Sequence, residues 1–184
     1  MKVDFLSQQL IISTPSVDDE LFQHSVVLLF KHNEAGAFGL IINKPTEHQL
    51  GEVLLDLKLN ADCLGSKEPI YQGGPLGVDR GFILHSSGMR WPSTVKVTEQ
   101  VFLTTSNDIL EDISKDLGPT EYLVALGYSS WGPGQLEEEL KDNAWLVVQP
   151  NRKLIFGDPG TRYARAAGQI GINIDLVTQQ KGVQ

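Results

Sequence analysis

The sequence predicts an α+β fold in a single domain spanning residues 1–184. Short, β-branched apolar runs typical of buried strands recur along the chain, and other segments place apolar residues at the spacing of an amphipathic helix. About eight strands and four helices are expected, mixed without a strict strand–helix alternation. This order disfavours a doubly wound parallel sheet. We find no internal repeat, low-complexity segment or linker that would divide the chain.

The first predicted strands are apolar at almost every position. Residues 10–12 form one such run, and residues 25–30 and 39–42 form two more. The polar segment between the last two predicts a hairpin, in which Asn33 and Gly36 would take positive φ angles. Because these runs lack polar alternation, we expect both faces of the strands to be covered.

The middle of the chain is predicted to hold two helices among short strands. Four apolar residues at helical spacing predict a helix over residues 50–57, and a second set predicts one over residues 109–117, capped by Ser106 or Asn107. Strands are expected at residues 69–71 and 82–85, on either side of a glycine-rich turn. Residues 95–105 would supply two short strands or one bent strand.

The C-terminal part is predicted to alternate strand, loop and helix. A strand over residues 122–126 would enter a glycine-rich loop at 127–135, followed by a helix over residues 133–143 with Pro133 at its first position. In that helix Glu137 and Lys141 would form a solvated pair. Residues 145–149 and 154–156 are expected to be paired strands. A last helix would open at Asp158, and the polar tail from Thr178 would fray.

The charge composition bears on whether the protein binds nucleic acid. The formal net charge is −8, from 15 basic and 23 acidic residues. Because non-specific nucleic-acid affinity comes mainly from Lys and Arg, direct DNA binding is disfavoured. The densest basic segment, between Arg152 and Arg165, is diluted by Asp158.

Cysteine content and hydropathy point to a cytoplasmic protein without a membrane segment. The single cysteine, Cys63, excludes an internal disulfide framework and is expected to be a buried apolar filler. The N-terminus lacks the basic start and apolar run of a secretory signal. No apolar stretch approaches the ~20 residues of a membrane helix.

Several glycine-centred segments resemble those of the YqgE/AlgH family of small bacterial proteins. They are Ser25-Val26-Val27 through His32-Asn33 to Gly39-Leu40-Ile41-Ile42-Asn43-Lys44-Pro45; Gly73-Gly74-Pro75; Gly81-Phe82-Ile83-Leu84-His85; and Gly127-Tyr128 with Trp131-Gly132-Pro133-Gly134-Gln135-Leu136-Glu137. Phe156 and residues 165–171 extend the resemblance, which covers nearly the whole chain.

The resemblance implies a strongly bent mixed sheet that forms a pseudo-barrel with peripheral helices. It also brings a transcriptional-regulator label, attached to alginate-linked members, but no established activity, cofactor or catalytic residue. This chain departs from the family in having Ser129-Ser130 where Ala-Gly is common, so those hydroxyls are not expected to be required. The tail after Leu176 also lacks the expected ending.

The segment 127–135 carries the first candidate site. Gly127-Tyr128-Ser129-Ser130-Trp131 superficially resembles a nucleophile elbow, but Trp131 stands where the elbow needs glycine, and all four histidines precede Ser129. Gly132 and Gly134 instead lie at a predicted helix N-terminus, which favours an anion. The alternative is a glycine-rich cap packed against Trp131.

The segment 73–85 carries the second candidate site. Gly73 and Gly74 precede Arg80, whose planar guanidinium suits carboxylate or phosphate, and His85, which can exchange a proton near neutral pH. The structural alternative is that Asp79 pairs with Arg80 and fixes the turn.

A metal site is not expected. His24 and His32 lie eight residues apart, roughly 25 Å along a strand, which is too far to share an ion. His32 and Asn33 are expected to shape the hairpin turn. Trp91 and Trp145 are expected in the core or at its rim, whereas Trp131, inside a glycine-rich loop, is expected to be exposed.

These observations favour a non-enzymatic protein that binds a partner protein or a small anionic ligand, without a cofactor. Gly73, Gly74, Arg80, His85, Trp131, Gly132 and Gly134 are the predicted site residues. Arg80 would hold the anion, Trp131 would be an apolar anchor, and any effect on transcription would be indirect. Two alternatives stay open: an enzyme on a small phosphorylated or carboxylated substrate with His85 as general acid or base, and a DNA-binding regulator.

Overall fold

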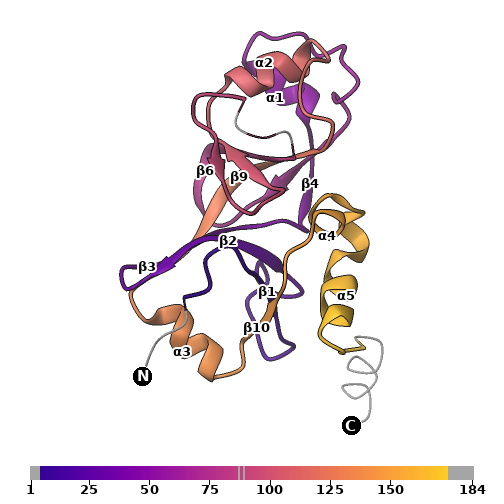
Figure 1. The fold of residues 1–184 in the computed structure, drawn as a ribbon. Helices are drawn as coiled ribbons and strands as arrows, with labels where there is room; N and C mark the ends of the chain where they lie inside the picture. The colour runs from indigo at the N-terminus through magenta and orange to yellow at the C-terminus, as the bar shows by residue number, and fades with distance from the viewer. Residues whose placement is uncertain (1–4, 87, 89, 174–184) are drawn as a thin grey trace.

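In the computed structural model, which describes residues 5–86, 88 and 90–173, one strand, β9, connects the two parts of the fold (Figure 1). The strands are β1 (Leu10–Ser13), β2 (Val26–Asn33), β3 (Gly36–Ile41), β4 (Pro45–Gln49), β5 (Pro69–Gln72), β6 (Leu76–His85), β7 (Val95–Lys96), β8 (Phe102–Thr104), β9 (Tyr122–Trp131) and β10 (Trp145–Val148). The helices are α1 (Leu50–Asp56), α2 (Asp108–Ser114), α3 (Gln135–Lys141), α4 (Arg152–Phe156) and α5 (Pro159–Gln169).

The strands form a curled, mostly antiparallel sheet in the order β10-β1-β2-β3-β9-β6-β8-β7. The parallel pair of β5 with β9 makes the sheet mixed. This arrangement confirms the predicted α+β class and the bent mixed sheet. Among the described residues there are ten strands and five helices, slightly more of each than expected.

Strand β9 changes partners along its length. Its first half pairs with β5 and β6, and its last three residues pair with β3, where Gly39 faces Ser129. Between these halves Gly127 has a φ of +78°, a conformation that residues with a Cβ rarely adopt. The bend at this glycine lets one strand serve both parts of the sheet.

Both faces of strands β1, β2 and β3 are covered, as the uniformly apolar runs predict. Helix α3 packs its Leu136 on the face that carries Ile11, Val27 and Leu29. The opposite face, which carries the alternate residues of the same strands, packs against α4 and α5 (Figure 1). Alternating residues of one strand therefore enter two different cores.

The upper part of the molecule has a core of its own beneath α1 and α2 (Figure 1). Leu50 and Leu54 of α1 and Ile109 of α2 meet Trp91 there. Cys63 is buried in the same core, as the sequence predicts. None of the helices in the described part of the chain is long and apolar enough to cross a membrane.

Strand β6 begins at Leu76, earlier than the strand expected at 82–85, and three predicted elements of the C-terminal part are wrong in type or extent. Residues 154–156 lie in helix α4 rather than in a strand, because Asn151 caps that helix by accepting from the Leu154 amide. The expected loop at 127–135 is a strand up to Trp131. The glycine here does not start a loop but lets two backbone segments pass close to each other. Helix α3 begins at Gln135, with Gly134 in a left-handed conformation at its N-cap, and Pro133 lies outside it.

The β2–β3 turn also differs from the prediction. Gly36 has a φ of +124°, but Asn33 does not adopt a positive φ. Its side-chain oxygen instead accepts a hydrogen bond from the Ala35 amide at 2.9 Å, which fixes the turn by the usual route for asparagine. The predictions for the tail after Leu176 and from Thr178 lie outside the described residues.

Candidate functional site

An arginine lies over a group of aromatic rings on one end of the sheet. The Cζ atom of Arg80 is 5.6 Å from the ring centre of Phe82 and 5.7 Å from that of Tyr128. The ring of Phe38 is 4.8 Å from that of Tyr128, and Phe30 follows at 5.6 Å from Phe38. We call these five residues the Arg80 platform.

The guanidinium of Arg80 has no acidic partner among the described residues. The ion pairs found there involve other residues, and none joins Arg80 to Asp79. The alternative that Asp79 pairs with Arg80 to fix the turn is therefore wrong. Because the ring faces attract the cation without using its N–H groups, those donors remain available to an oxyanion.

The platform borders a protruding segment of β6. Leu76 pairs with Tyr128 and Gly81 pairs with Leu126, so residues 77–80 bulge out opposite Gly127 alone. Two exposed apolar side chains lie near Arg80, which are Leu76 at the edge of the bulge, 44% exposed, and Val78 on it, 64% exposed. The bulge therefore presents apolar and cationic groups side by side to solvent.

Gly73 and Gly74 pack closely against β9, the strand that carries Tyr128 of the platform. The Gly73 carbonyl accepts from the Ile41 amide at 2.8 Å and from the Ser129 hydroxyl at 3.2 Å. A Cβ on Gly74 would lie 2.1 Å from the Tyr128 backbone. These glycines therefore let the chain before β6 lie directly on β9, and this contact positions Tyr128.

His85 does not share a site with Arg80. It lies at the other end of β6, fully buried, with its Nε2 atom 2.7 Å from the Thr104 hydroxyl. Trp91 and Phe102 enclose the ring. Burial, together with the nearby charge of Arg90, lowers the pKa of His85 to about 4. A neutral, enclosed imidazole is a core histidine, and the predicted common site of His85 and Arg80 is not formed.

Trp131 is buried, contrary to the expectation that it is exposed. Only 4% of the residue is accessible, because its side chain points to the face of β9 opposite Tyr128 and packs on Trp145. Its Nε1–H donates to Glu139 at 2.9 Å, and Trp145 donates to the same carboxylate oxygen at 2.7 Å. Trp131 therefore holds α3 on the sheet and is not a surface anchor.

Gly132 and Gly134 do not form the predicted anion site. The Gly132 amide already donates to the side chain of Gln135 at 3.0 Å. Helix α3 has seven residues and carries Glu137 and Glu138 in its first turn, which disfavours an anion there. Gly132 and Gly134 instead form a glycine-rich cap at the start of α3, which was the alternative to an anion site.

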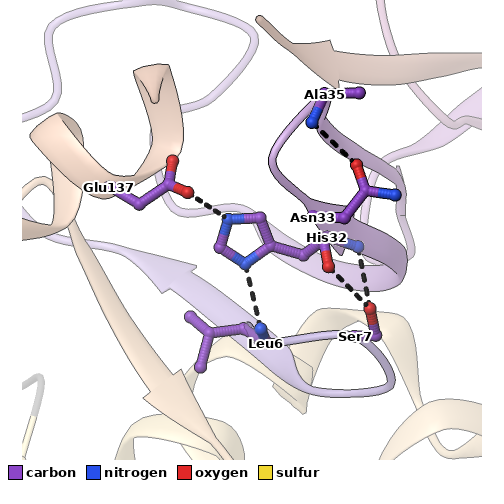
Figure 2. Close-up of polar contacts among 6 residues, drawn as sticks. All are labelled: Leu6, Ser7, His32, Asn33, Ala35 and Glu137. Atoms are coloured by element: carbon purple, nitrogen blue, oxygen red, sulfur yellow. Dashed lines mark hydrogen bonds and ion pairs between the residues drawn. The ribbon is translucent and has the colours of Figure 1, made fainter. Parts of the chain in front are cut away.

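A buried histidine–glutamate pair was not anticipated. Figure 2 shows the ring of His32 between Leu6 and Glu137. The Leu6 amide donates to Nδ1 at 2.9 Å, so the ring proton is on Nε2, which donates to Glu137 at 3.0 Å. The Ser7 hydroxyl donates to the His32 carbonyl and accepts from the His32 amide (Figure 2). With both ring nitrogens occupied, this pair holds the N-terminal segment and α3 on β2.

The pairing predicted for α3 is corrected by the same contacts. Glu137 faces His32 rather than Lys141, and Lys141 pairs with Glu138 at 2.7 Å. The described residues contain no cluster of three His, Cys, Asp or Glu side chains that could hold a metal.

The aromatic residues of the platform were also missed from the sequence. Phe38 pairs with Lys31 across the β2–β3 turn, Phe30 lies at the register shift between Leu29 and Lys31, and Tyr128 lies one residue after the bend in β9. The signal was the position of Phe38, Phe82 and Tyr128 beside glycine, and Phe30 lacks even that. That signal does not reveal which face of a strand each ring occupies.

Comparison with known proteins finds relatives over almost the whole chain. A family model described as AlgH-like matches residues 10–175. A UPF0301 protein of Thioalkalivibrio sulfidiphilus is 41% identical over 96% of this chain and 95% of its own length. One from Vibrio vulnificus is 40% identical over 96% and 98%.

Two solved structures share the fold. The solution structure of the AlgH protein from Pseudomonas aeruginosa superposes with a TM-score of 0.79, at 40% identity and 97% coverage of both chains. A crystal structure of a Corynebacterium diphtheriae protein has a TM-score of 0.70 over 89% of this chain and 85% of its own. At 18% identity the second likeness concerns the fold alone.

Proposed function

This chain belongs to the AlgH-like family, and we propose that it acts by binding rather than by catalysis. Its ligand is an anionic group, carried by a partner protein, that contacts Arg80. The observation that carries this proposal is the guanidinium of Arg80, held over Phe82 and Tyr128 without an acidic partner among the described residues.

The surroundings of Arg80 favour a protein over a small ligand. Leu76 and Val78 are exposed beside Arg80, and the partly buried Tyr128 lies beneath the guanidinium and contacts the ring of Phe38. Protein interfaces are enriched in arginine and aromatic residues, and a few such anchors supply most of the binding energy. An acidic residue flanked by apolar ones would complement this surface. A free carboxylate or phosphate ligand is the simpler form of the same chemistry.

The overall charge of the chain does not oppose this contact strongly. A net charge of −8 repels an acidic partner at long range, but screening confines exposed charges to about 8 Å at physiological salt. Hydrogen bonds to charged groups contribute about 1.5–3 kcal/mol each. The local cation therefore dominates once the surfaces meet.

The two alternatives receive less support. A general acid or base at His85 would have to reach substrate, and that ring is fully buried. For DNA binding, the densest basic segment is dispersed, because Arg162 is buried and Arg152 pairs with Glu121. A regulatory effect on transcription would then be indirect, through the partner, in the cytoplasm.

A tagged pull-down from native cytoplasm, with and without nuclease, tests the proposal. Each protein captured is then purified and titrated against wild type, Arg80→Ala and Arg80→Lys. Arg80→Ala should weaken binding by at least about tenfold, or ~1.4 kcal/mol. Arg80→Lys should recover only part of the affinity, since lysine lacks the planar fork.

Arg165→Ala is the matched control. It removes the same charge from an exposed position on α5 and should leave affinity unchanged. Equal loss in both variants would indicate a general charge effect and remove Arg80 from the site. Capture that nuclease abolishes would instead favour the nucleic-acid alternative.

A further inference from the structure

Three of the four basic residues between positions 152 and 165 border one groove on the surface. They are Arg152 and Lys153 of α4 and Arg165 of α5, and all three are exposed. The groove has a volume of about 750 Å³, which lies within the roughly 300–1,000 Å³ of small-molecule sites. The fourth basic residue, Arg162, is buried and lies outside the lining.

Hydrogen bonds hold together the two helices that form this groove. Arg162 of α5 donates from Nε to the Leu154 carbonyl at 3.2 Å and from Nη2 to the Gly157 carbonyl at 2.7 Å. At the other end of α5, the side-chain amide of Asn151 donates to the side-chain oxygen of Gln169 at 2.5 Å. The exposed cations are therefore carried by helices fixed to each other, which gives the groove a defined geometry.

The groove carries two positive charges that are not neutralised. Arg152 donates to the Glu121 carboxylate at 2.5 Å, so these two charges offset each other. Lys153 and Arg165 form no ion pair with any described residue. The residues that line the groove include none that is acidic. A ligand with two negative charges would therefore balance the lining.

The floor of the groove is open over α5. Arg165, Gly168 and Gln169 lie three and four residues apart, so they share one face of the helix. Gly168 is exposed, and a Cβ added to it would have no neighbouring atom within 4 Å. Leu154 of α4 also lines the groove. The absence of a side chain at Gly168 leaves room beside the Arg165 guanidinium for the apolar part of a ligand.

We propose that this groove binds a small phosphate monoester with a compact apolar substituent. Its phosphate lies on Arg165 and Lys153, and its substituent lies over Gly168 and Leu154. A phosphate monoester carries about 1.5–2 negative charges at pH 7, which matches the two cations. The planar fork of arginine bonds two phosphate oxygens at once, and lysine adds a point charge.

Two alternatives fit the groove less well. A nucleic-acid duplex needs many phosphate contacts for its affinity, and two cations that are not neutralised are too few. A monoanion would leave one of the two charges unbalanced. The groove shares no residue with the Arg80 platform, and this proposal does not depend on the function proposed there.

NMR titration of the ¹⁵N-labelled full chain tests the proposal with three probes, which are phenyl phosphate, phenyl sulfate and inorganic phosphate. Phenyl phosphate should shift the amide resonances of residues 152–154 and 165–169. Phenyl sulfate has the same shape but one charge, and it should bind at least about tenfold more weakly. Inorganic phosphate should also bind more weakly, because it leaves the floor uncovered. Absence of phenyl phosphate binding at millimolar concentration, or equal binding of the sulfate ester, would overturn the proposal.

Variants then locate the ligand. Arg165→Gln and Lys153→Gln remove exposed charges, and each should weaken phenyl phosphate by about tenfold. Gly168→Leu places a side chain on the floor of the groove. It should weaken phenyl phosphate more than inorganic phosphate, since only the ester needs that space. Thermal unfolding of each variant checks that the fold is retained.

Two further variants are the controls, and both should bind phenyl phosphate as wild type does. Lys115→Gln removes an exposed charge at the end of α2, away from the groove, and Arg80→Ala removes the cation of the other site. Equal weakening by Lys115→Gln and Lys153→Gln would indicate a general charge effect and overturn the assignment. Loss of binding in Arg80→Ala alone would assign the ligand to the Arg80 platform. Affinity unchanged in both Arg165→Gln and Lys153→Gln would place the ligand outside the groove.

Discussion

His32 Nε2 and Glu137 Oε1 lie 3.0 Å apart, and this hydrogen bond joins helix α3 to the end of strand β2. Replacing Glu137 by Ala leaves the buried Nε2–H without its acceptor, so the free energy of unfolding should fall by about 1–3 kcal/mol. Urea denaturation at pH 7 measures the change.

The neighbouring Glu138 is the control for this prediction. It forms an exposed pair with Lys141, and such pairs contribute about 0–1 kcal/mol. Glu138→Ala should therefore be close to wild type. Equal destabilisation by the two substitutions would mean that helix charge, not the bond to His32, determines the effect.

His85 should make the protein less stable in mild acid. Its pKa is about 4 in the folded state, against about 6.5 for an unfolded chain, so between these values the unfolded state binds more protons. The free energy of unfolding therefore falls as pH is lowered through this window, by about 2–3 kcal/mol in total from this group.

Denaturation curves of wild type and His85→Gln between pH 7 and pH 4 separate this contribution from that of the carboxylates. The variant should be less stable at pH 7 but should lose less stability on acidification. Parallel pH profiles for the two proteins would contradict the assignment to His85.

Gly74→Ala should displace the backbone at Tyr128. The added methyl would lie 2.1 Å from the backbone of β9, which cannot move without breaking its pairs with β6. We expect a loss of about 3 kcal/mol or a failure to fold. Gly168→Ala, in α5 with nothing within 4 Å, should instead stabilise the protein by up to about 1 kcal/mol. Thermal unfolding of the two variants compares them directly.

The fluorescence of Trp131 should resist quenching. In Trp91→Phe/Trp145→Phe it is the single remaining tryptophan, and it is buried against the sheet. Acrylamide should quench it weakly in the folded protein and strongly after unfolding. Strong quenching of a folded variant would restore the expectation that Trp131 is a surface residue.

Much of the fold could be predicted because it follows from local pattern. The apolar runs at residues 25–30 and 39–42 identified covered strands, and the spacing of Leu50 and Leu54 identified α1. Residues 154–156 failed because three apolar residues fit a strand or a buried helical turn equally well, and the cap from Asn151 decided between them.

The candidate site was predicted only in part, for a related reason. Arg80 and Gly74 meet at Tyr128, and Gly73 lies against Gly127, so the two glycine-rich segments do lie side by side. His85 and Trp131 did not join them, because strand alternation and the bend at Gly127 direct those side chains elsewhere. Arg162 gave no signal, since a buried arginine on a short helix has the same local sequence as an exposed one.

The bulge between Leu76 and Gly81 is a suitable place for protein engineering. Both of its ends are anchored to β9, so residues 78–80 can be exchanged without shifting the register of either strand. Gly77, with a φ of +50° and little room beside Tyr128, must be kept. A short segment can thus be replaced while the strands beside it keep their positions, and the binding specificity could be changed without altering the rest of the chain.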